Sequence, residues 1–223
     1  MASGRRLRAL LPCLLACGSA AALAAGPKLY ETGPAQDAAF IRFVNGTDQK
    51  LDVVSGKARM DLQPASEYLP VKPNSELKGS FEGAAGKSAI AVKTAPGAFT
   101  TVVAVVPAGQ KAPVTAFITE TPDEFNALKS FIALYNFDAS CKAAQVKVAG
   151  RDTALFTGVA QGAMQRRAVN PVALGVQLVC DGKPAGKPVD LGTLAAGMRY
   201  SLVLVPSAAT GSRLIFAPDD LAR

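Results

Sequence analysis

Few residues of this chain could perform chemistry, and histidine is not among them. A hydrolase or acyltransferase of the Ser-His-Asp or Cys-His type needs an imidazole as its base, so the composition excludes those classes. Paired carboxylates can hydrolyse a glycosidic bond without histidine, and Asp123-Glu124 is the clearest such pair. The pair follows Thr121-Pro122, where acidic side chains favour the first turn of a helix, so we interpret it as structural. We predict no catalytic residue.

The usual sequence patterns of cofactor and metal sites do not occur either. The chain contains no P-loop, no dinucleotide-binding glycine pattern and no G-x-S-x-G elbow. A zinc site would have to use cysteine and carboxylate ligands alone, and the cysteines are better explained by a disulfide. We therefore predict no cofactor and no metal ion.

Two cysteines, Cys141 and Cys180, remain once the predicted export signal is removed. In an oxidising compartment two cysteines most simply form one disulfide, which here would close a loop of about 40 residues. The alternative is a redox-active or nucleophilic pair. That alternative lacks the C-x-x-C spacing and a histidine to activate the thiol. We predict a structural disulfide.

One polar cluster, formed by Arg166, Arg167 and Asn170, could bind a partner. Adjacent guanidinium groups can clamp a carboxylate, or an acidic patch on another protein, through bidentate hydrogen bonds. The alternative is an exposed strand face with solvated charges. We keep the three residues as predicted partner-binding residues.

The first 25 residues have the pattern of a cleaved export signal. Arg5, Arg6 and Arg8 precede a short apolar run, and Ala22-Leu23-Ala24 offers the small residues of a signal-peptidase site. The alternative is a lipoprotein signal that ends at Cys17. Without these three arginines, 21 Lys and Arg face 17 Asp and Glu, and the charge is evenly spread. This balance argues against nucleic-acid binding, and we expect a periplasmic protein.

The chain writes two similar segments: AFIRFVN at residues 39–45 and SFIALYN at residues 130–136. Residues 93–107 and 192–206 correspond in the same way, each with a glycine turn before a β-branched run ending in Pro. Between these segments, short apolar runs alternate with Pro and Gly, which excludes long helices and indicates short strands. A repeat of about ninety residues is typical of an immunoglobulin-like β-sandwich.

We therefore predict an all-β chain of two tandem immunoglobulin-like β-sandwich domains joined by a short linker. The predicted boundaries are a signal peptide at 1–25, an N-terminal sandwich at 26–119, a linker at 120–129 and a C-terminal sandwich at 130–223. The linker is the one stretch with helical signals, so we expect a helical turn or two there. We expect Val114–Ile118 to be the last, edge strand of the first sandwich.

Two sets of residues resemble a known family. The first set is Leu29-Tyr30, Pro34-Ala35, Ala39–Asn45 and Leu51-Asp52-Val53, and the second is Arg167, Asn170-Pro171-Val172 and Cys180-Asp181-Gly182. In their order and spacing, these sets resemble AlgF-type alginate O-acetylation proteins over most of the mature chain.

The resemblance implies a periplasmic protein of two β-sandwich domains that is required to acetylate an exopolysaccharide such as alginate and has no catalytic residues of its own. In that family picture, a membrane O-acyltransferase exports acetyl groups and separate periplasmic O-acetyltransferases place them on the polymer. The AlgF-like member would be an adaptor between these partners, with the polysaccharide as a further partner. Related adaptors occur in acetylated cellulose systems, so the polymer stays open.

Two other functions remain as alternatives. A carbohydrate-binding or export-chaperone module could hold the nascent polymer, but the chain has no Trp and only four Tyr to stack on sugar rings, and two of these, Tyr135 and Tyr200, lie in strand runs expected to be core. An acetyl-transferring enzyme could use a Ser or Lys nucleophile without histidine.

Overall fold

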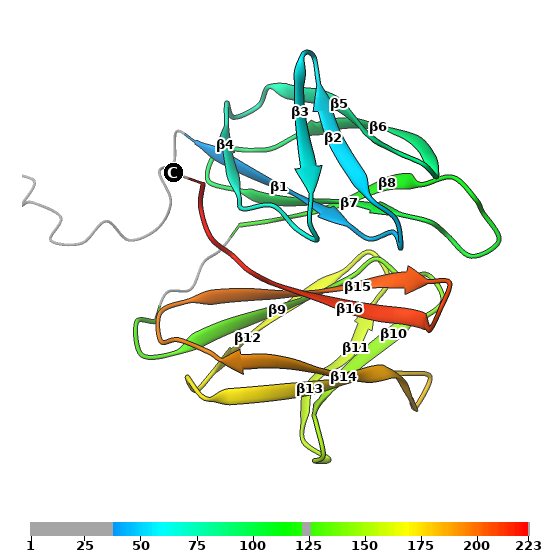
Figure 1. Cartoon of the computed structure of the whole chain (residues 1–223). Coiled ribbons are helices and arrows are strands. Elements are labelled where there is room, and N and C mark those ends of the chain that lie inside the picture. The colour runs from blue at the N-terminus through cyan, green and yellow to red at the C-terminus, as the bar shows by residue number, and fades with distance from the viewer. Residues whose placement is uncertain (1–37, 122–125, 223) are drawn as a thin grey trace, which may run out of the picture. The chain divides into compact units, whose positions relative to one another are not determined.

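The computed structural model describes residues 38–121 and 126–222, and the predicted signal peptide lies outside them. The described residues form sixteen strands in four four-stranded sheets (Figure 1). Within these ranges there is no helix, and so none that is long and apolar enough to cross a membrane. The prediction of an all-β protein with two tandem sandwiches is confirmed.

Two sheets make the N-terminal sandwich. The first contains, in spatial order, β4 (Leu69–Val71), β1 (Ala39–Asn45), β7 (Phe99–Val105) and β8 (Val114–Glu120). The second contains β3 (Ala58–Leu62), β2 (Leu51–Ser55), β5 (Glu76–Gly83) and β6 (Gly86–Lys93). Strands β1 and β7 are parallel, while the other named pairs are antiparallel. Phe43 and Phe81 pack edge to face in the core between the two sheets.

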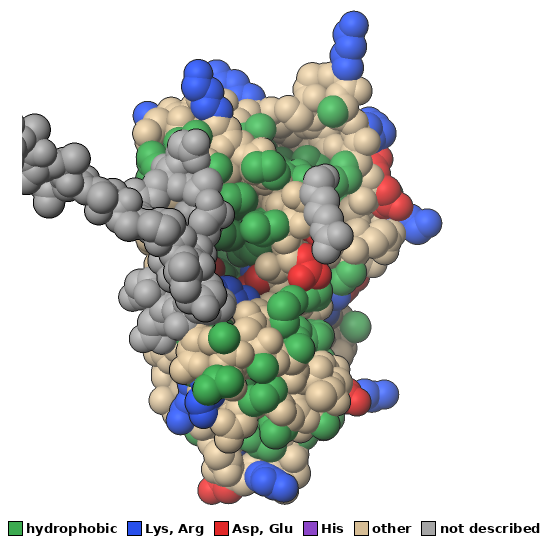
Figure 2. All heavy atoms as spheres, turned by 90° about the vertical axis from the view of Figure 1, so that its left-hand side faces the viewer, with side chains coloured by type: hydrophobic (Ala, Val, Ile, Leu, Met, Phe, Trp, Pro, Cys, Tyr) green, Lys and Arg blue, Asp and Glu red, His purple; other side chains and the backbone are tan. Residues whose placement is uncertain are grey.

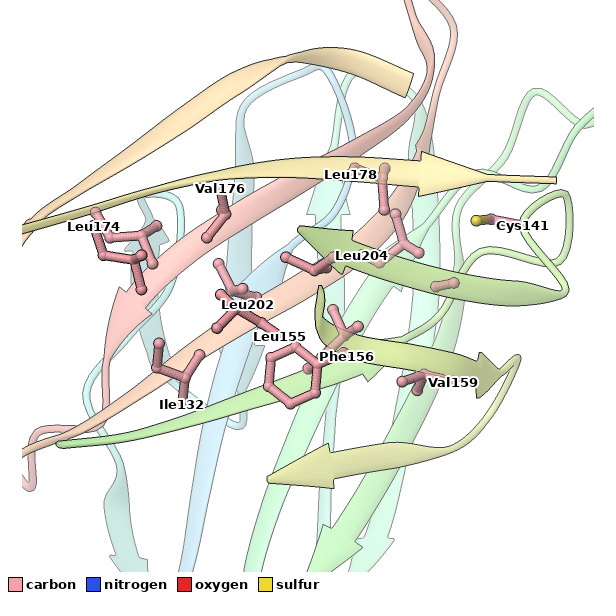
Figure 3. Packing of buried hydrophobic residues seen from close by; sticks show 14 of the residues in the cluster. Ile132, Cys141, Leu155, Phe156, Val159, Leu174, Val176, Leu178, Leu202 and Leu204 are labelled. Carbon is pink, nitrogen blue, oxygen red and sulfur yellow. The ribbon is translucent and has the colours of Figure 1, made fainter. Parts of the chain in front are cut away.

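The C-terminal sandwich repeats this plan. Its first sheet contains β12 (Met164–Val169), β9 (Ser130–Asn136), β15 (Arg199–Ser207) and β16 (Gly211–Pro218). Its second contains β11 (Ala154–Ala160), β10 (Ala143–Val148), β13 (Ala173–Cys180) and β14 (Lys183–Thr193). Strands β9 and β15 are parallel, as β1 and β7 are. Figure 3 shows Ile132, Leu202 and Leu204 from one sheet among Phe156, Val176 and other side chains of the second sheet.

The two similar segments are strands β1 and β9, and each is buried along all seven of its residues. Successive side chains of a strand point to opposite faces, so both faces of these strands must be covered. On one face, Ile41 of β1 and Ile132 of β9 enter the cores of their own sandwiches. On the other face, Val44 and Tyr135 join a third apolar cluster, whose members come from both sandwiches. The two segments are alike because each strand packs into its own core on one face and into the shared apolar cluster on the other.

The predicted edge strand corresponds to β8, which lies at one edge of its sheet and continues to Glu120. The helical turn expected at 120–129 is wrong in the described part of that stretch. Glu120 still pairs with Phe99 of β7, and residues 126–129 form a turn closed by the Lys129 N–H on the Asn126 carbonyl (3.1 Å). Residues 122–125 lie outside the description, and the four domain boundaries stay a prediction.

Strands β11, β14 and β16 were not expected from the sequence. Strand β14 contains Pro184 and Pro188, which normally argue against a strand because proline cannot donate a ladder hydrogen bond. It lies at the edge of its sheet, where proline is tolerated, and its register with β13 shifts twice. The two prolines of β14 therefore do not prevent this segment from joining the sheet as its edge strand.

The predicted bond between Cys141 and Cys180 is confirmed: the two residues form a disulfide, with their Cα atoms 5.2 Å apart. Cys141 follows β9 in the chain, and Cys180 ends β13. The side chain of Cys141 is fully buried in the core of the C-terminal sandwich. The disulfide therefore links the β9–β10 connection of the C-terminal sandwich to the end of β13.

Replacing both cysteines, Cys141→Ala with Cys180→Ala, should lower the free energy of unfolding by about 4 kcal/mol, because the unfolded chain regains the freedom of a loop of 39 residues. Urea unfolding with and without a reducing agent measures this loss. Reductant should destabilise the wild type to the level of the double variant and leave that variant unchanged. A wild type whose unfolding ignores reductant would contradict the prediction.

Candidate functional site

Sheet β4-β1-β7-β8 of the first sandwich packs against sheet β12-β9-β15-β16 of the second, and we call these two the inner sheets. A cluster of polar side chains lies buried where the inner sheets meet, and we call it the polar seam. Its members are Arg42, Tyr68, Thr101, Glu120, Tyr135, Arg166, Ser201 and Asp219. Tyr135 also belongs to the apolar cluster that contains Val44, so the seam and that cluster are in contact. The seam is the most highly charged buried region of the described chain.

The centre of the polar seam is Arg42, the one charged residue of AFIRFVN, with none of its surface exposed. Its Nε donates a hydrogen bond to the Thr101 hydroxyl (3.0 Å), and its Nη1 donates to the Asp219 carboxylate (2.7 Å). Its guanidinium carbon lies 4.6 Å from the ring centre of Tyr68 and 5.5 Å from that of Tyr135. Both aromatic faces add a cation–π attraction to the ion pair.

Asp219 brings the C-terminal sandwich into this arrangement. It directly follows β16, and its carboxylate also accepts a hydrogen bond from the Ser201 hydroxyl of β15 (2.6 Å). The partner cation on β1 lies 177 residues away in the sequence. A buried ion pair contributes little net stability, but any arrangement that separates its members leaves a buried charge unpaired. The ion pair therefore favours the one alignment of the two inner sheets that keeps both charges paired.

A second ion pair crosses the seam a short way off. Glu120, at the end of β8, accepts hydrogen bonds from the Tyr135 hydroxyl and from Nη2 of Arg166 (2.6 Å). Tyr135 lies on β9 and Arg166 on β12, so one carboxylate of the N-terminal sandwich holds two strands of the other.

The electrostatics of the seam keep its arginines charged and its tyrosines neutral. Burial raises the pKa of Tyr68 to about 12, and burial raises the pKa of Tyr135 well above its usual range. Burial alone would lower the pKa of Arg42, but the neighbouring Tyr68 and Asp219 outweigh it and raise that pKa. The pKa of Arg166 is raised in the same way, where Glu120 outweighs burial. At neutral pH the arginines are charged and the tyrosines neutral.

This arrangement is suited to holding structure in place. Its charges are paired and buried, so a polymeric substrate has no access to them. A phenol with a raised pKa is a poor general base at neutral pH. Among residues 38–121 and 126–222, no group of three or more acidic or cysteine side chains is placed to hold a metal ion. The seam therefore fixes the two sandwiches against each other.

A cavity of about 270 Å³ lies between the sheets of the N-terminal sandwich. Its lining includes Ile41, Met60, Leu69, Leu77 and Ile90. Figure 2 shows hydrophobic side chains gathered on one face of the molecule. Ligand sites normally add a few convergent polar groups to an apolar lining, and those groups orient the ligand. This cavity is almost wholly apolar, so it offers little to orient a polar substrate.

The structure separates the three predicted partner-binding residues. Arg166 is mostly buried and paired with Glu120 in the seam. Arg167, the next residue of β12, points to the other face and donates to the carbonyls of Ala154 (3.3 Å) and Leu155 (3.0 Å). Asn170 is exposed beyond the end of the strand. The role of these residues in binding a partner stays a prediction.

Asn170 belongs to a set of neighbouring loops that we call the loop surface, defined by Leu128, Lys129, Asn170, Val172 and Met198. The Asn170 side chain accepts a hydrogen bond from Lys129 Nζ (2.7 Å). Three apolar members are exposed, and Leu128 most of all, at 78%. Exposed apolar side chains close to polar ones are typical of protein contact surfaces.

Backbone hydrogen bonds connect these loops. The Gly197 N–H donates to the Lys129 carbonyl (2.8 Å), and the Leu194 N–H donates to the Val172 carbonyl (3.1 Å). Gly197 has a φ of +77°, a conformation that favours glycine. The loop surface is therefore built on a defined backbone.

The sequence interpretation missed the central residues of the seam: Arg42, Glu120 and Asp219. One signal was available, because an arginine inside an otherwise apolar, fully buried run needs a buried partner. Nothing local in the sequence identifies that partner as Asp219. The predicted linker begins at Glu120, whereas the structure places that residue at the end of β8.

The strand pairing and the seam define a class of protein: a two-domain, tandem β-sandwich protein with one disulfide inside its second domain. The family model described as "Alginate O-acetyl transferase AlgF" matches residues 12–200. The chain belongs to the AlgF family. Its family is thus one implicated in alginate O-acetylation.

Two solved structures are similar to parts of the chain. The C-terminal domain of AlgF from P. aeruginosa is 24% identical, with a TM-score of 0.35, and the match covers 41% of this chain and 98% of that one. A putative cell adhesion protein from Bacteroides uniformis is 14% identical, with a TM-score of 0.29, and the match covers 83% of this chain and 100% of that one. No curated protein matches the chain. The strand pairing alone defines the fold.

Replacing Arg42 with Met should cost about 3–5 kcal/mol of unfolding free energy, because the Asp219 carboxylate then stays buried without its cation. Denaturant unfolding measures the loss. Adding Asp219→Asn to Arg42→Met should recover part of it, and a double-mutant cycle gives the coupling between the two residues.

The matched control is Arg59→Met, which removes an arginine from an ion pair whose guanidinium side chain is more than half exposed. Solvent screens that pair, so its loss should be much smaller than the loss at Arg42. Equal losses for the two variants would show that the buried pair has no special role.

Alkaline pH should destabilise the protein through Tyr68. The pKa of Tyr68 is about 12 in the folded state, above the value of about 10 in an unfolded chain. The neutral hydroxyl therefore stabilises the fold fully below pH 10, and this stabilisation is lost as the pH rises from about 10 to about 12. Two pKa units correspond to about 3 kcal/mol of unfolding free energy.

Tyr68→Phe has no hydroxyl to ionise and should lose less stability than the wild type over that pH range. Urea unfolding at pH 9, 10, 11 and 12 of both proteins gives the two profiles. Parallel profiles would mean that Tyr68 ionises as easily in the folded as in the unfolded chain.

Proposed function

We propose that this protein is a non-catalytic periplasmic adaptor required for O-acetylation of an exopolysaccharide such as alginate. One observation carries the proposal: a member of a family described by alginate O-acetyl transfer has no histidine anywhere in its chain. Transfer by a Ser-His-Asp enzyme needs an imidazole to activate the serine. In this proposal the chain serves that reaction through binding, and other proteins supply the base.

The periplasm fits the covalent structure of the chain. The Cys141–Cys180 disulfide persists in oxidising compartments and is rare in the cytosol. The export signal predicted at residues 1–25 would deliver the chain there. In that compartment the protein would link the membrane step that exports acyl groups to the acetyltransferases that act on the polymer.

The partners in this proposal are periplasmic polysaccharide O-acetyltransferases and a membrane O-acyltransferase. Arg167 and Asn170 are exposed and support a contact with one of them, next to the apolar side chains of the loop surface. Arg166 would contribute indirectly, by holding β12, the strand that carries Arg167, against Glu120.

The alternative of a carbohydrate-binding or export-chaperone module has less support. Tyr68 and Tyr135 are buried in the seam, and Tyr200 is partly buried and stacked on Phe216. These three tyrosines therefore form no exposed strip for sugar rings. The fourth, Tyr30, lies outside the described residues.

Deleting the gene should abolish or strongly reduce O-acetyl groups per sugar on the secreted polysaccharide and leave the polymer yield unchanged. The reason is that an adaptor for acetylation acts after chain synthesis. Complementation with the wild-type gene is the control. Normal acetylation in the deletion strain would refute the proposal, and a fall in yield alone would favour the carbohydrate-binding alternative.

The purified protein by itself should transfer no acetyl groups from a chromogenic acetyl ester to alginate oligosaccharides above the rate in buffer. The chain has no histidine to act as base, so the uncatalysed rate is expected. Mass spectrometry of the oligosaccharides and the colour change of the ester both measure this rate. Rapid consumption of the ester with acetylated product would overturn the non-catalytic part of the proposal.

A further inference from the structure

The four sheets of the described chain end in eight edge strands, and an edge strand exposes unpaired backbone N–H and C=O groups. Proteins usually block such edges with charged residues, prolines, bulges or very short strands. The eight edges can therefore be compared by the protection that each one carries.

Seven edges are protected. The protections are Pro70 in the three-residue β4, Arg59 and Asp61 in β3, Lys87 and Lys93 in β6, Arg167 in β12, Pro184 and Pro188 in β14, Arg213 and Pro218 in β16, and register shifts in β11. Each of these features disfavours the addition of a further strand.

Strand β8 is the exception among the described edges. From Val114 to Thr119 it reads VTAFIT, with no charge, no proline and no glycine. Its register with β7 runs without a shift from Val114 to Glu120. The one charged residue, Glu120, is turned into the seam and paired with Arg166. Nothing along this edge opposes an incoming strand.

We propose that β8 binds an extended segment of a partner protein, which adds as a further strand to the sheet β4-β1-β7-β8. This inference rests on the proposed adaptor function and names the surface that one partner uses. Main-chain hydrogen bonds along the edge supply affinity in this mode of recognition, and side chains at alternate positions supply specificity.

The side chains of β8 define what the segment must present. Phe117 is 52% exposed and lies opposite Val102, whose side chain enters the core of the N-terminal sandwich. Val114 is 38% exposed and lies opposite Val105, on the other face of the sheet. An incoming strand therefore meets apolar surface on both faces. The fitting segment is uncharged and free of proline, with apolar residues at alternate positions, since a charge beside β8 would lose water without gaining a partner.

The edge is held ready for this contact. The Thr115 hydroxyl lies 2.6 Å from that of Ser88, and the Thr119 hydroxyl lies 2.8 Å from that of Thr100. Glu120 anchors the end of the strand in the seam. Because β8 is already ordered, little conformational entropy is lost when a segment binds.

A second copy of this chain is a weaker occupant. Seven residues of strand extend for about 24 Å, and a strip one strand wide has an area of only a few hundred Å². A stable dimer needs about 800 Å² from each partner. A rigid copy would meet only the strip, whereas a flexible segment makes the same main-chain hydrogen bonds and also folds over Phe117.

The test uses full-length protein expressed in the deletion strain. Phe117→Lys places on β8 the protection that the other edges carry, and Val114→Lys does so at a second position. Ala89→Lys, an exposed site on the already lysine-bearing β6, is the matched control. The two β8 variants should lower O-acetyl content to the level of the deletion strain, and the control should restore it. Thermal unfolding of each purified variant confirms that it is folded.

A photo-crosslinking amino acid at position 117, and at position 89 as control, identifies the occupant in cells. Crosslinks from position 117 to an uncharged extended segment of an acetyltransferase or the acyltransferase are the expected result. Crosslinks to a second copy would overturn the choice of occupant. Normal acetylation in both folded β8 variants would overturn the docking edge. If the deletion strain lacks acetyl groups in that same experiment, the adaptor function itself is not refuted.

Discussion

The Arg42–Asp219 ion pair is the constraint on which the arrangement of the inner sheets depends. The apolar side chains around it gain stability from burial in almost any relative position, because hydrophobic contacts have no preferred direction. The ion pair is directional, and both of its members are buried. A shift of one sheet against the other would leave two charges without water or partner, at a cost of several kcal/mol. The apolar contacts hold the two inner sheets together, and the ion pair selects one alignment of the sheets.

The same constraint explains where the molecule keeps its free surfaces. Strands β1 and β9 are buried on both faces, so the inner sheets offer only their edges and connecting loops to other molecules. Most of these edges carry charges or prolines, which keep them soluble and unpaired. The edge β8 and the loop surface are therefore the places where we propose that partners bind. An adaptor of the proposed kind can have precisely placed contacts when its sheets are fixed in this way.

Local sequence signals predicted much of this fold. Short apolar runs between Pro and Gly predicted most of the strands, the repeat predicted two sandwiches, and two cysteines in an exported chain predicted their disulfide. The misses share a physical cause. Strand β14 contains prolines that only an edge position tolerates, and the partner of Arg42 lies 177 residues away. The sequence predicts β8 as an edge strand because it is the last strand before the linker. The edge position of β14 and the pairing of Arg42 arise only in the assembled sheets, so no window of sequence displays them.

One ion pair connects the two surfaces that the adaptor would use. Glu120 ends β8, the proposed docking edge, and it binds Arg166 of β12, whose neighbour Arg167 is an exposed, predicted partner-binding residue that also donates to the Ala154 carbonyl of β11. Because β8 and β12 belong to different sandwiches, this contact fixes a surface on one sandwich relative to a surface on the other. An adaptor that aligns two enzymes needs such a link, since two domains on a loose tether would hold their partners near each other without setting their orientation. The buried charges would thus give the proposed adaptor a fixed geometry.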